Sequence, residues 1–129
     1  MQTQRESTAE AEARALRDMA EQTPAEMARF LQDTFSQRVV AYIAGIEDHK
    51  QVGRWARGLN TPRIDSENRL RAACQVFHFI ANCENPHIAR AWMMGMNPQL
   101  DDASPIEAIS EGRQKEVMAA ARSFQRGDL

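Results

Sequence analysis

The stretch SQRVVAYIAGIEDHKQVGRWARGLNTPR, residues Ser36–Arg63, holds two short helical patterns separated by a glycine. Branched apolar residues begin the first pattern, and Gly45 is placed to end it in a left-handed conformation, which glycine adopts without steric cost. The spacing predicts a second helix over about Asp48–Arg57, ended by Gly58. Two short helices joined by a tight turn that contains glycine form a helix-turn-helix.

The second predicted helix has one apolar face and one polar face. Residues at i, i+3, i+4 and i+7 form a stripe that we expect to be buried: Val52, Trp55, Ala56 and Leu59. The opposite face carries Lys50, Gln51, Arg54 and Arg57. Arginine and lysine can donate to guanine, glutamine can read adenine, and all of them can reach phosphate.

The predicted helix-turn-helix indicates which side chains would meet DNA. The second helix of this motif enters the major groove by its N-terminal end. This arrangement would place Lys50, Gln51 and Arg54 nearest the base edges. The turn after the helix would lie beside the DNA backbone with Asn60, Thr61 and Arg63. The alternative is a basic, solvated face on an ordinary helical bundle, which spacing alone does not exclude.

The positive charge of the chain is concentrated in the same segment. The 129 residues have a formal net charge of -2. Residues 36–72 nevertheless carry about +3, from Arg38, Lys50, Arg54, Arg57, Arg63, Arg69 and Arg71 against Glu47, Asp48, Asp65 and Glu67. A nucleic-acid surface needs only a local positive field, so the acidic total does not exclude DNA binding.

Helical periodicity recurs along the chain, and no alternating run rich in valine or isoleucine predicts a strand. Three helix starts are explicit, because Ser7, Thr23 and Ser104 each stand three residues before a glutamate, the spacing of a capping box. The longest predicted helix ends at Cys83 and has apolar residues, Val76 and Phe79, on a second face, as expected where two packing units meet. We therefore expect an all-α fold.

We divide the chain into an N-terminal helical arm (1–22), a helix-turn-helix domain (23–83) and a small C-terminal helical domain (84–129). The first segment has few large apolar residues, so we expect a marginal helix or an arm. There is no apolar leader and no run of about 18 apolar residues that could span a membrane. We expect a cytoplasmic protein with reduced cysteines, because Cys74 and Cys83 would point to opposite faces of one helix.

The later stretch WMMGMNPQLDDASPIEAI, Trp92–Ile109, concentrates methionines before a turn. Met93 and Met96 stand three apart, so they would share a helix face and form a buried anchor with Trp92. Met94 lies off this face, and we expect it to be the more exposed methionine. The pair of aspartates that follows is interpreted as a solvated turn.

Two parts of the chain resemble known families. QVGRWARGLNTPR resembles the second helix and following turn of Xre/Cro-type repressors. The later stretch resembles the C-terminal region of the MbcA/ParS/Xre antitoxin family, through Trp92, Asn97, Pro98, Leu100, Pro105, Ile106, Glu107 and Ile109. Met93 and Met96 stand where Leu and Pro are usual, and Asp102 replaces a turn glycine, although aspartate tolerates a left-handed conformation.

The resemblance, which covers about residues 35–127, implies an antitoxin of a type II toxin-antitoxin system. The C-terminal domain would cover the active site of a cognate RES-domain toxin, an enzyme that consumes NAD, and the helix-turn-helix would repress the shared operon. The candidate toxin-binding residues are Met94, Asn97, Pro98, Leu100, Asp101, Asp102, Arg122 and Arg126.

We expect a homodimer within a larger toxin-antitoxin complex, because helix-turn-helix proteins usually bind paired half-sites. One alternative is a stand-alone dimeric Xre-type transcription regulator whose C-terminal domain only oligomerises. A second alternative is an antitoxin whose helix-turn-helix no longer binds DNA.

Residues Cys74, His78, Cys83 and His87 have a spacing that raises the possibility of a zinc site. Helix geometry argues against it, because Cys83 would lie about half a turn away from Cys74. The sequence has no glycine-rich phosphate loop, no metalloprotease helix and no nucleophile elbow. We therefore expect no metal, no cofactor and no catalytic activity.

Overall fold

The computed structural model describes residues 7–127, and the fold over this range is all-α, as predicted. The elements are α1 (Thr8–Ala20), α2 (Pro24–Thr34), α3 (Gln37–Ala44), α4 (Lys50–Ala56), α5 (Ile64–Cys83), α6 (Pro86–Met94), the 3-10 turn η1 (Pro98–Leu100), α7 (Pro105–Ser110) and α8 (Gln114–Arg126). The predicted helices are confirmed, with ends that differ by one or two residues.

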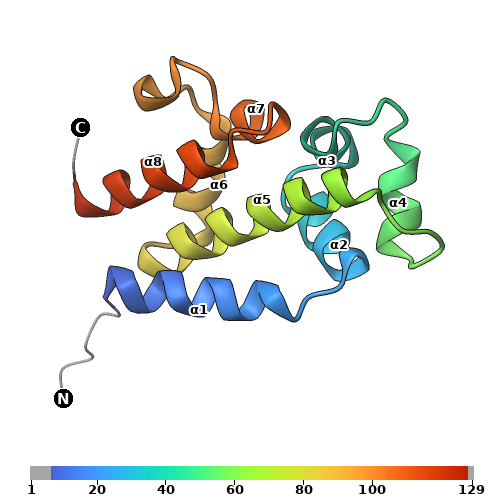
Figure 1. The fold of residues 1–129 in the computed structure, drawn as a ribbon, viewed down its shortest axis with the longest axis horizontal. Helices are drawn as coiled ribbons and strands as arrows, with labels where there is room; N and C mark the ends of the chain where they lie inside the picture. Colours follow the sequence, from blue (N-terminus) through green and yellow to red (C-terminus); the bar gives the residue numbers. More distant parts are fainter. Residues whose placement is uncertain (1–6, 128–129) are drawn as a thin grey trace.

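The longest helix, α5, runs through the middle of the molecule (Figure 1). Helix α1 lies along it, α2 to α4 gather toward its N-terminal end, and α6 to α8 pack against the remainder (Figure 1). Val76 and Phe79 are both buried, so the second apolar face predicted for this helix is confirmed. The buried apolar side chains form one cluster that includes residues of all three predicted segments. The three-domain division stays a prediction.

The three predicted helix starts are confirmed by the same hydrogen bond. In each, the cap hydroxyl accepts from the backbone N–H of the glutamate three residues later, at 3.0 to 3.1 Å, for Ser7 with Glu10, Thr23 with Glu26 and Ser104 with Glu107. Such a cap contributes about 1 kcal/mol by satisfying a donor that has no partner within the helix. Asn85 caps α6 in the same way.

Each of the first four helices ends on a carbonyl that accepts a hydrogen bond from an arginine elsewhere in the fold. The pairs are Arg71 with Met19, Arg90 with Thr34, Arg69 with Ala44 and Arg29 with Ala56. A cation at a helix C-terminus meets both unpaired carbonyls and the negative end of the helix dipole. Arg69 and Arg71 therefore cap helices while they keep their positive charge, and Arg71 also pairs with Glu67 at 3.6 Å.

Helix α1 packs onto the fold through small residues. Ala11, Ala15 and Met19 are buried, whereas Leu16 is 55% exposed. The alanines allow α1 to lie close to α5, which a search for large apolar residues does not detect. Within residues 7–127, no helix is long and apolar enough to cross a membrane.

Candidate nucleic-acid interface and partner surface

The turn of the helix-turn-helix depends on Gly45. Gly45 has φ 78°, the left-handed conformation predicted for it, and its N–H donates to the carbonyl of Ala41 at 2.9 Å. A Cβ on Gly45 would lie 2.8 Å from a guanidinium nitrogen of Arg69. That arginine and Ser66 both donate to the carbonyl of Ala44, at 3.1 and 2.7 Å. Glycine is therefore required for the backbone conformation and for the close approach of Arg69.

Helix α4 presents the two predicted faces, with one correction. Val52, Trp55 and Ala56 are buried. Lys50, Arg54 and Arg57 are exposed, and Gln51 is half-buried. The prediction that Leu59 continues the buried stripe is wrong, because this side chain is 66% exposed. The helix ends at Ala56 and the chain turns at Gly58, with φ 71°, so Leu59 leaves the helical register.

A shallow polar hollow gathers the basic residues of α4 with two glutamines of neighbouring helices. Its lining is Gln32, Gln37, Lys50, Gly53, Arg54 and Arg57. Gln37 donates to Gln32 at 3.2 Å. A Cβ on Gly53 would lie 2.9 Å from the Gln37 amide nitrogen. The absence of a side chain at Gly53 therefore allows the Gln37 amide to lie close to the backbone of α4. The two glutamines are not among the residues predicted from the sequence, where their only signal is this glycine inside a short helix.

The exposed face of α4 is basic and uncompensated. Within residues 7–127, Lys50, Arg54 and Arg57 form no ion pair with a carboxylate. The neighbouring Asp48 accepts a hydrogen bond from the backbone N–H of Lys50 at 3.0 Å, and so caps the start of α4. The face can therefore meet phosphate without first breaking an ion pair of its own.

The remaining candidates for DNA contact lie on the turn after α4. Asn60 donates from its side-chain amide to the amide oxygen of Gln51 at 3.0 Å. Thr61 and Arg63 are exposed on the way into α5. Asn60 is thus hydrogen-bonded to a residue of the α4 face, whereas Thr61 and Arg63 lie farther along the turn.

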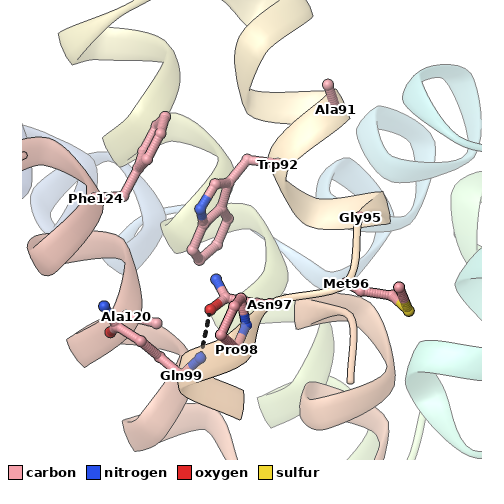
Figure 2. Close-up of a pocket in the computed structure, with 9 residues that line it drawn as sticks. All are labelled: Ala91, Trp92, Gly95, Met96, Asn97, Pro98, Gln99, Ala120 and Phe124. Carbon is pink, nitrogen blue, oxygen red and sulfur yellow. Dashed lines mark hydrogen bonds between the residues drawn. The ribbon is translucent and has the colours of Figure 1, made fainter. Parts of the chain in front are cut away.

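An apolar hollow of about 340 Å³ lies between α6, η1 and α8. Ala91, Trp92, Gly95, Met96, Asn97, Pro98, Gln99, Ala120 and Phe124 line it. The rings of Trp92 and Phe124 are 6.0 Å apart between centroids. Figure 2 shows the indole of Trp92 directed toward the Asn97–Pro98 turn, with Phe124 approaching from α8. Sequence reasoning did not select Phe124, because its partner lies 32 positions earlier in the chain.

The methionines before the turn differ from the prediction. Met93 is buried, as expected, but Met96 is 81% exposed and is no part of a buried anchor. Gly95 has extended backbone angles, φ -91° and ψ 155°, so Met96 has left the helix. Its side chain points away from the Trp92 ring (Figure 2). Met94 is 45% exposed, which is more than Met93 but less than Met96, so the prediction that Met94 is the most exposed of these three methionines is wrong.

Asn97 holds the following turn together. Its carbonyl accepts from the N–H groups of Leu100 and Asp102 at 2.9 and 3.0 Å, and its own N–H donates to Ala103 at 3.0 Å. Its side chain accepts from the N–H of Gln99 at 2.9 Å, the dashed line in Figure 2. Leu100 is buried beneath the turn. Among the predicted toxin contacts, Asn97 and Pro98 line the hollow, whereas Leu100 is covered.

Both aspartates adopt the left-handed conformation, which was expected to be tolerated at Asp102. Asp101 has φ 57° and Asp102 has φ 66°, and both are exposed. Asp101 also pairs with Arg113 at 3.3 Å. The tolerance of aspartate for this conformation explains how Asp102 can stand at a position where the resembling family has glycine.

The two arginines of α8 already have partners within the chain. Arg122 donates to both carboxylate oxygens of Glu12 on α1, at 2.6 to 3.1 Å, and this hydrogen bond raises the pKa of Arg122. Arg126 donates to Ser123 at 3.4 Å. A toxin contact through Arg122 would therefore compete with an intramolecular ion pair.

Of the Cys/His constellation, Cys74, His78 and Cys83 lie on α5 and His87 lies in the first turn of α6. Cys74 and Cys83 are buried and unbridged, and burial raises the pKa of the Cys74 thiol to about 12. His78 stacks on Phe30 with ring centroids 4.6 Å apart, and burial lowers its pKa while Asp18 acts in the opposite direction. No group of three or more metal-ligating side chains occurs within residues 7–127.

Comparisons with protein-family models, curated proteins and solved structures give no match for this chain.

Proposed function

We propose that this protein is an antitoxin that binds operator DNA through its helix-turn-helix and a RES-domain, NAD-consuming toxin through its C-terminal helices. The observation that carries the DNA-binding half is the exposed basic face of α4, which has no ion pair among the described residues. An α-helix fits the major groove, and lysine and arginine release counterions when they contact phosphate.

The polar hollow beside α4 supports the same half of the proposal. Gln32 and Gln37 bring amide donors next to Lys50, Arg54 and Arg57. Amides of this kind commonly contact phosphate and sugar, which fixes the register of a protein on the duplex. Two copies of the chain would place two α4 helices on paired half-sites, so the proposed form on DNA is a homodimer.

The toxin-binding half rests on the resemblance in residues 92–109 and on the apolar hollow beside it. Trp92 and Phe124 form an aromatic pair there, and the exposed Met96 stands at its border. Aromatic residues and methionine are enriched in protein interfaces, and methionine adapts to the surface it meets. In this proposal the protein acts by occlusion and needs no catalytic group.

Co-expression with the neighbouring reading frame tests the toxin partner. If that frame encodes a RES-domain toxin, its expression alone should arrest growth and deplete NAD. Co-expression of this chain should restore both, and the two products should co-purify. If the neighbour causes no arrest and no partner co-purifies, the antitoxin proposal is wrong, and the stand-alone regulator becomes the better account.

A gel shift on the protein's own promoter tests DNA binding. Arg54→Ala should weaken site-specific binding by about 1 to 3 kcal/mol, because it removes a base or phosphate contact from the α4 face. Arg17→Ala, an exposed arginine on α1, serves as the charge-matched control and should bind as the wild type does. Absence of any shift with the wild-type protein would contradict the DNA-binding half alone.

A further inference from the structure

Two large apolar side chains are exposed beside the basic face of α4, on the segment that leads from α4 into α5. Leu59 and Ile64 are each 66% exposed, and among the large apolar side chains of residues 7–127 only Met96 is more exposed. Pro62 between them is buried, which holds the segment against the core at that point. One exposed leucine or isoleucine is ordinary on a protein surface, but two on one short segment form a small apolar patch.

Opposite charges flank Ile64 in the chain, and neither is paired within the protein. Arg63 and Asp65 are both exposed, and neither forms an ion pair within residues 7–127. Ile64 begins α5, and residues two apart on a helix do not face each other, so the two charges lie on different sides of Ile64. Both charges are therefore available to a molecule that covers Ile64.

The order Arg63, Ile64, Asp65 makes this surface complementary to itself. In an interface between two copies related by a two-fold axis, a residue near the axis meets its own counterpart, and each contact between different residues occurs twice. A two-fold axis beside Ile64 can place Arg63 of each copy opposite Asp65 of the other. A second copy thus satisfies both charges at once, whereas a DNA phosphate would satisfy Arg63 alone and would be repelled by Asp65.

The position of the patch suits two copies on DNA. The connection between α4 and α5 lies at the edge of the molecule, at the end away from the start of α1 and the end of α8 (Figure 1). A second copy bound there lies next to α4, so it can bring its own α4 to the neighbouring half-site. The Trp92 hollow lies toward the other end of the molecule and is left open for a toxin.

We infer that Leu59 and Ile64 form the contact between two copies of this chain on paired half-sites, with Arg63 of each copy paired to Asp65 of the other. The inference rests on the proposed DNA binding, and it gives Arg63 a protein partner in place of the DNA backbone predicted for it. These four residues are far fewer than the roughly 20 to 30 that each side contributes to a stable complex. The contact is therefore weak in solution and is expressed as cooperative binding of two copies to DNA.

Binding of the full-length protein to two matched duplexes tests this inference. One duplex carries paired half-sites obtained by selection of bound DNA from a random pool, and the other carries a single half-site. On the paired duplex the second copy should bind about tenfold or more tightly than the first. Leu59→Ser and Ile64→Ser should reduce this ratio to within about twofold, because they remove the apolar contact between the copies.

The same two variants should bind the single half-site as the wild type does, since both substitutions are neutral and leave the attraction for phosphate unchanged. Leu16→Ser is the matched control, because it removes a 55% exposed apolar side chain from α1, and it should keep the cooperativity. Circular dichroism checks that each variant is folded.

An exchange of the two charges is the sharper variant. Asp65→Arg places like charges opposite each other across the axis and should abolish the cooperativity. Arg63→Asp combined with Asp65→Arg restores opposite charges between the copies and should bring the cooperativity back. Arg17→Asp combined with Asp65→Arg restores only the net charge, because Arg17 is exposed on α1, and should leave the cooperativity lost.

The outcomes separate this inference from the proposed function. Sequence-specific binding to isolated half-sites, or cooperativity that Leu59→Ser and Asp65→Arg leave unchanged, overturns the inference and leaves DNA binding in place. Equal losses on both duplexes in folded Leu59→Ser and Ile64→Ser would mean that these side chains contact DNA, which also overturns it. If the wild type selects no sequence from the pool, sequence-specific DNA binding is itself wrong, and the inference is overturned with it.

Discussion

The surface around α4 and the surface around Trp92 share one hydrophobic core but differ in polarity. The first is polar and basic, with exposed Lys50, Arg54 and Arg57. The second is an apolar hollow with an aromatic pair and an exposed methionine. Helix α4 lies at one end of the molecule, and η1 and α8 lie toward the other (Figure 1).

Because the two surfaces differ in charge and polarity, we expect binding at each to respond to different solution conditions. Attraction between basic side chains and phosphate is screened by salt and falls steeply as ionic strength rises. Binding through burial of apolar area depends only weakly on the salt concentrations that screen charge, and kosmotropic ions strengthen it. Substitutions on one surface should therefore leave binding at the other unchanged, provided that the shared core stays folded.

The largest expected effect is a loss of stability on substitution of Gly45, in the turn that precedes α4. Gly45→Ala combines a positive φ with a Cβ 2.8 Å from Arg69, and should lower the free energy of unfolding by about 3 kcal/mol. Gly58→Ala is the matched control, since Gly58 also has a positive φ but open space around it, and should cost about 1 kcal/mol. Chemical denaturation measures both, and equal costs would contradict the role given to Arg69.

The next effect separates the two surfaces directly. Met96→Glu places a charge on the 81% exposed side chain beside the hollow and should weaken partner binding by about 2 kcal/mol while DNA binding stays within twofold. Arg54→Ala should show the reverse pattern. Leu59→Glu, a charge on another exposed apolar residue, is the control for partner binding. Titration calorimetry measures binding of each variant to the co-purified partner, and a gel shift measures its binding to DNA. Loss of both activities in one folded variant would contradict separate surfaces.

A smaller effect concerns the pH dependence of stability. Burial lowers the pKa of His78 below its ordinary value of 6.5, so the unfolded chain binds more protons than the folded chain in the range just below 6.5. The free energy of unfolding should therefore fall as the pH falls through this range and reach its full value above it. His78→Phe keeps a ring against Phe30 and should flatten the profile. His87→Gln, at an exposed histidine, should not, and denaturation from pH 5 to 8 measures the three proteins.

The smallest effect tests how the two surfaces build their turns. The α3–α4 region uses glycine at left-handed positions, whereas the turn after α6 uses two aspartates. Asp102→Gly should leave the free energy of unfolding within about 0.5 kcal/mol of wild type, because glycine accepts φ 66° but gains entropy when unfolded. Asp102→Ala should cost about 1 kcal/mol, since alanine lacks the local tolerance of aspartate. Equal thermal melting of all three would contradict a conformational role for Asp102.

Much of the fold was predictable because its signals are local. Caps join residues three apart, as at Ser7, Thr23 and Ser104, and the glycine stops act on their own backbone. The exposure of Leu59 and Met96 was predicted wrongly for a related reason. Helical spacing was extended past the point where each helix ends, and beyond that point spacing no longer places a side chain on a face.

The candidate sites were predictable only in part. The basic side chains of α4 share one helix, so their common face follows from periodicity. Gln32, Gln37 and Phe124 come from other helices and join the sites through packing. Nothing in their own neighbourhood in the chain marks them, and the signal for Gln37 lies on α4, where Gly53 has no side chain to occupy the space of the Gln37 amide.

From the amino-acid sequence alone we could predict where the capped helices begin, which residues could turn left-handed, and that α4 would have a basic face. These properties depend on bonds and spacings within a few residues. Only the packed fold shows that four arginines cap distant helix ends, that Arg122 pairs with Glu12, and that the side-chain amides of Asn60 and Gln51 are hydrogen-bonded. Each of these hydrogen bonds joins residues nine or more positions apart, and only the packed helices bring them within reach.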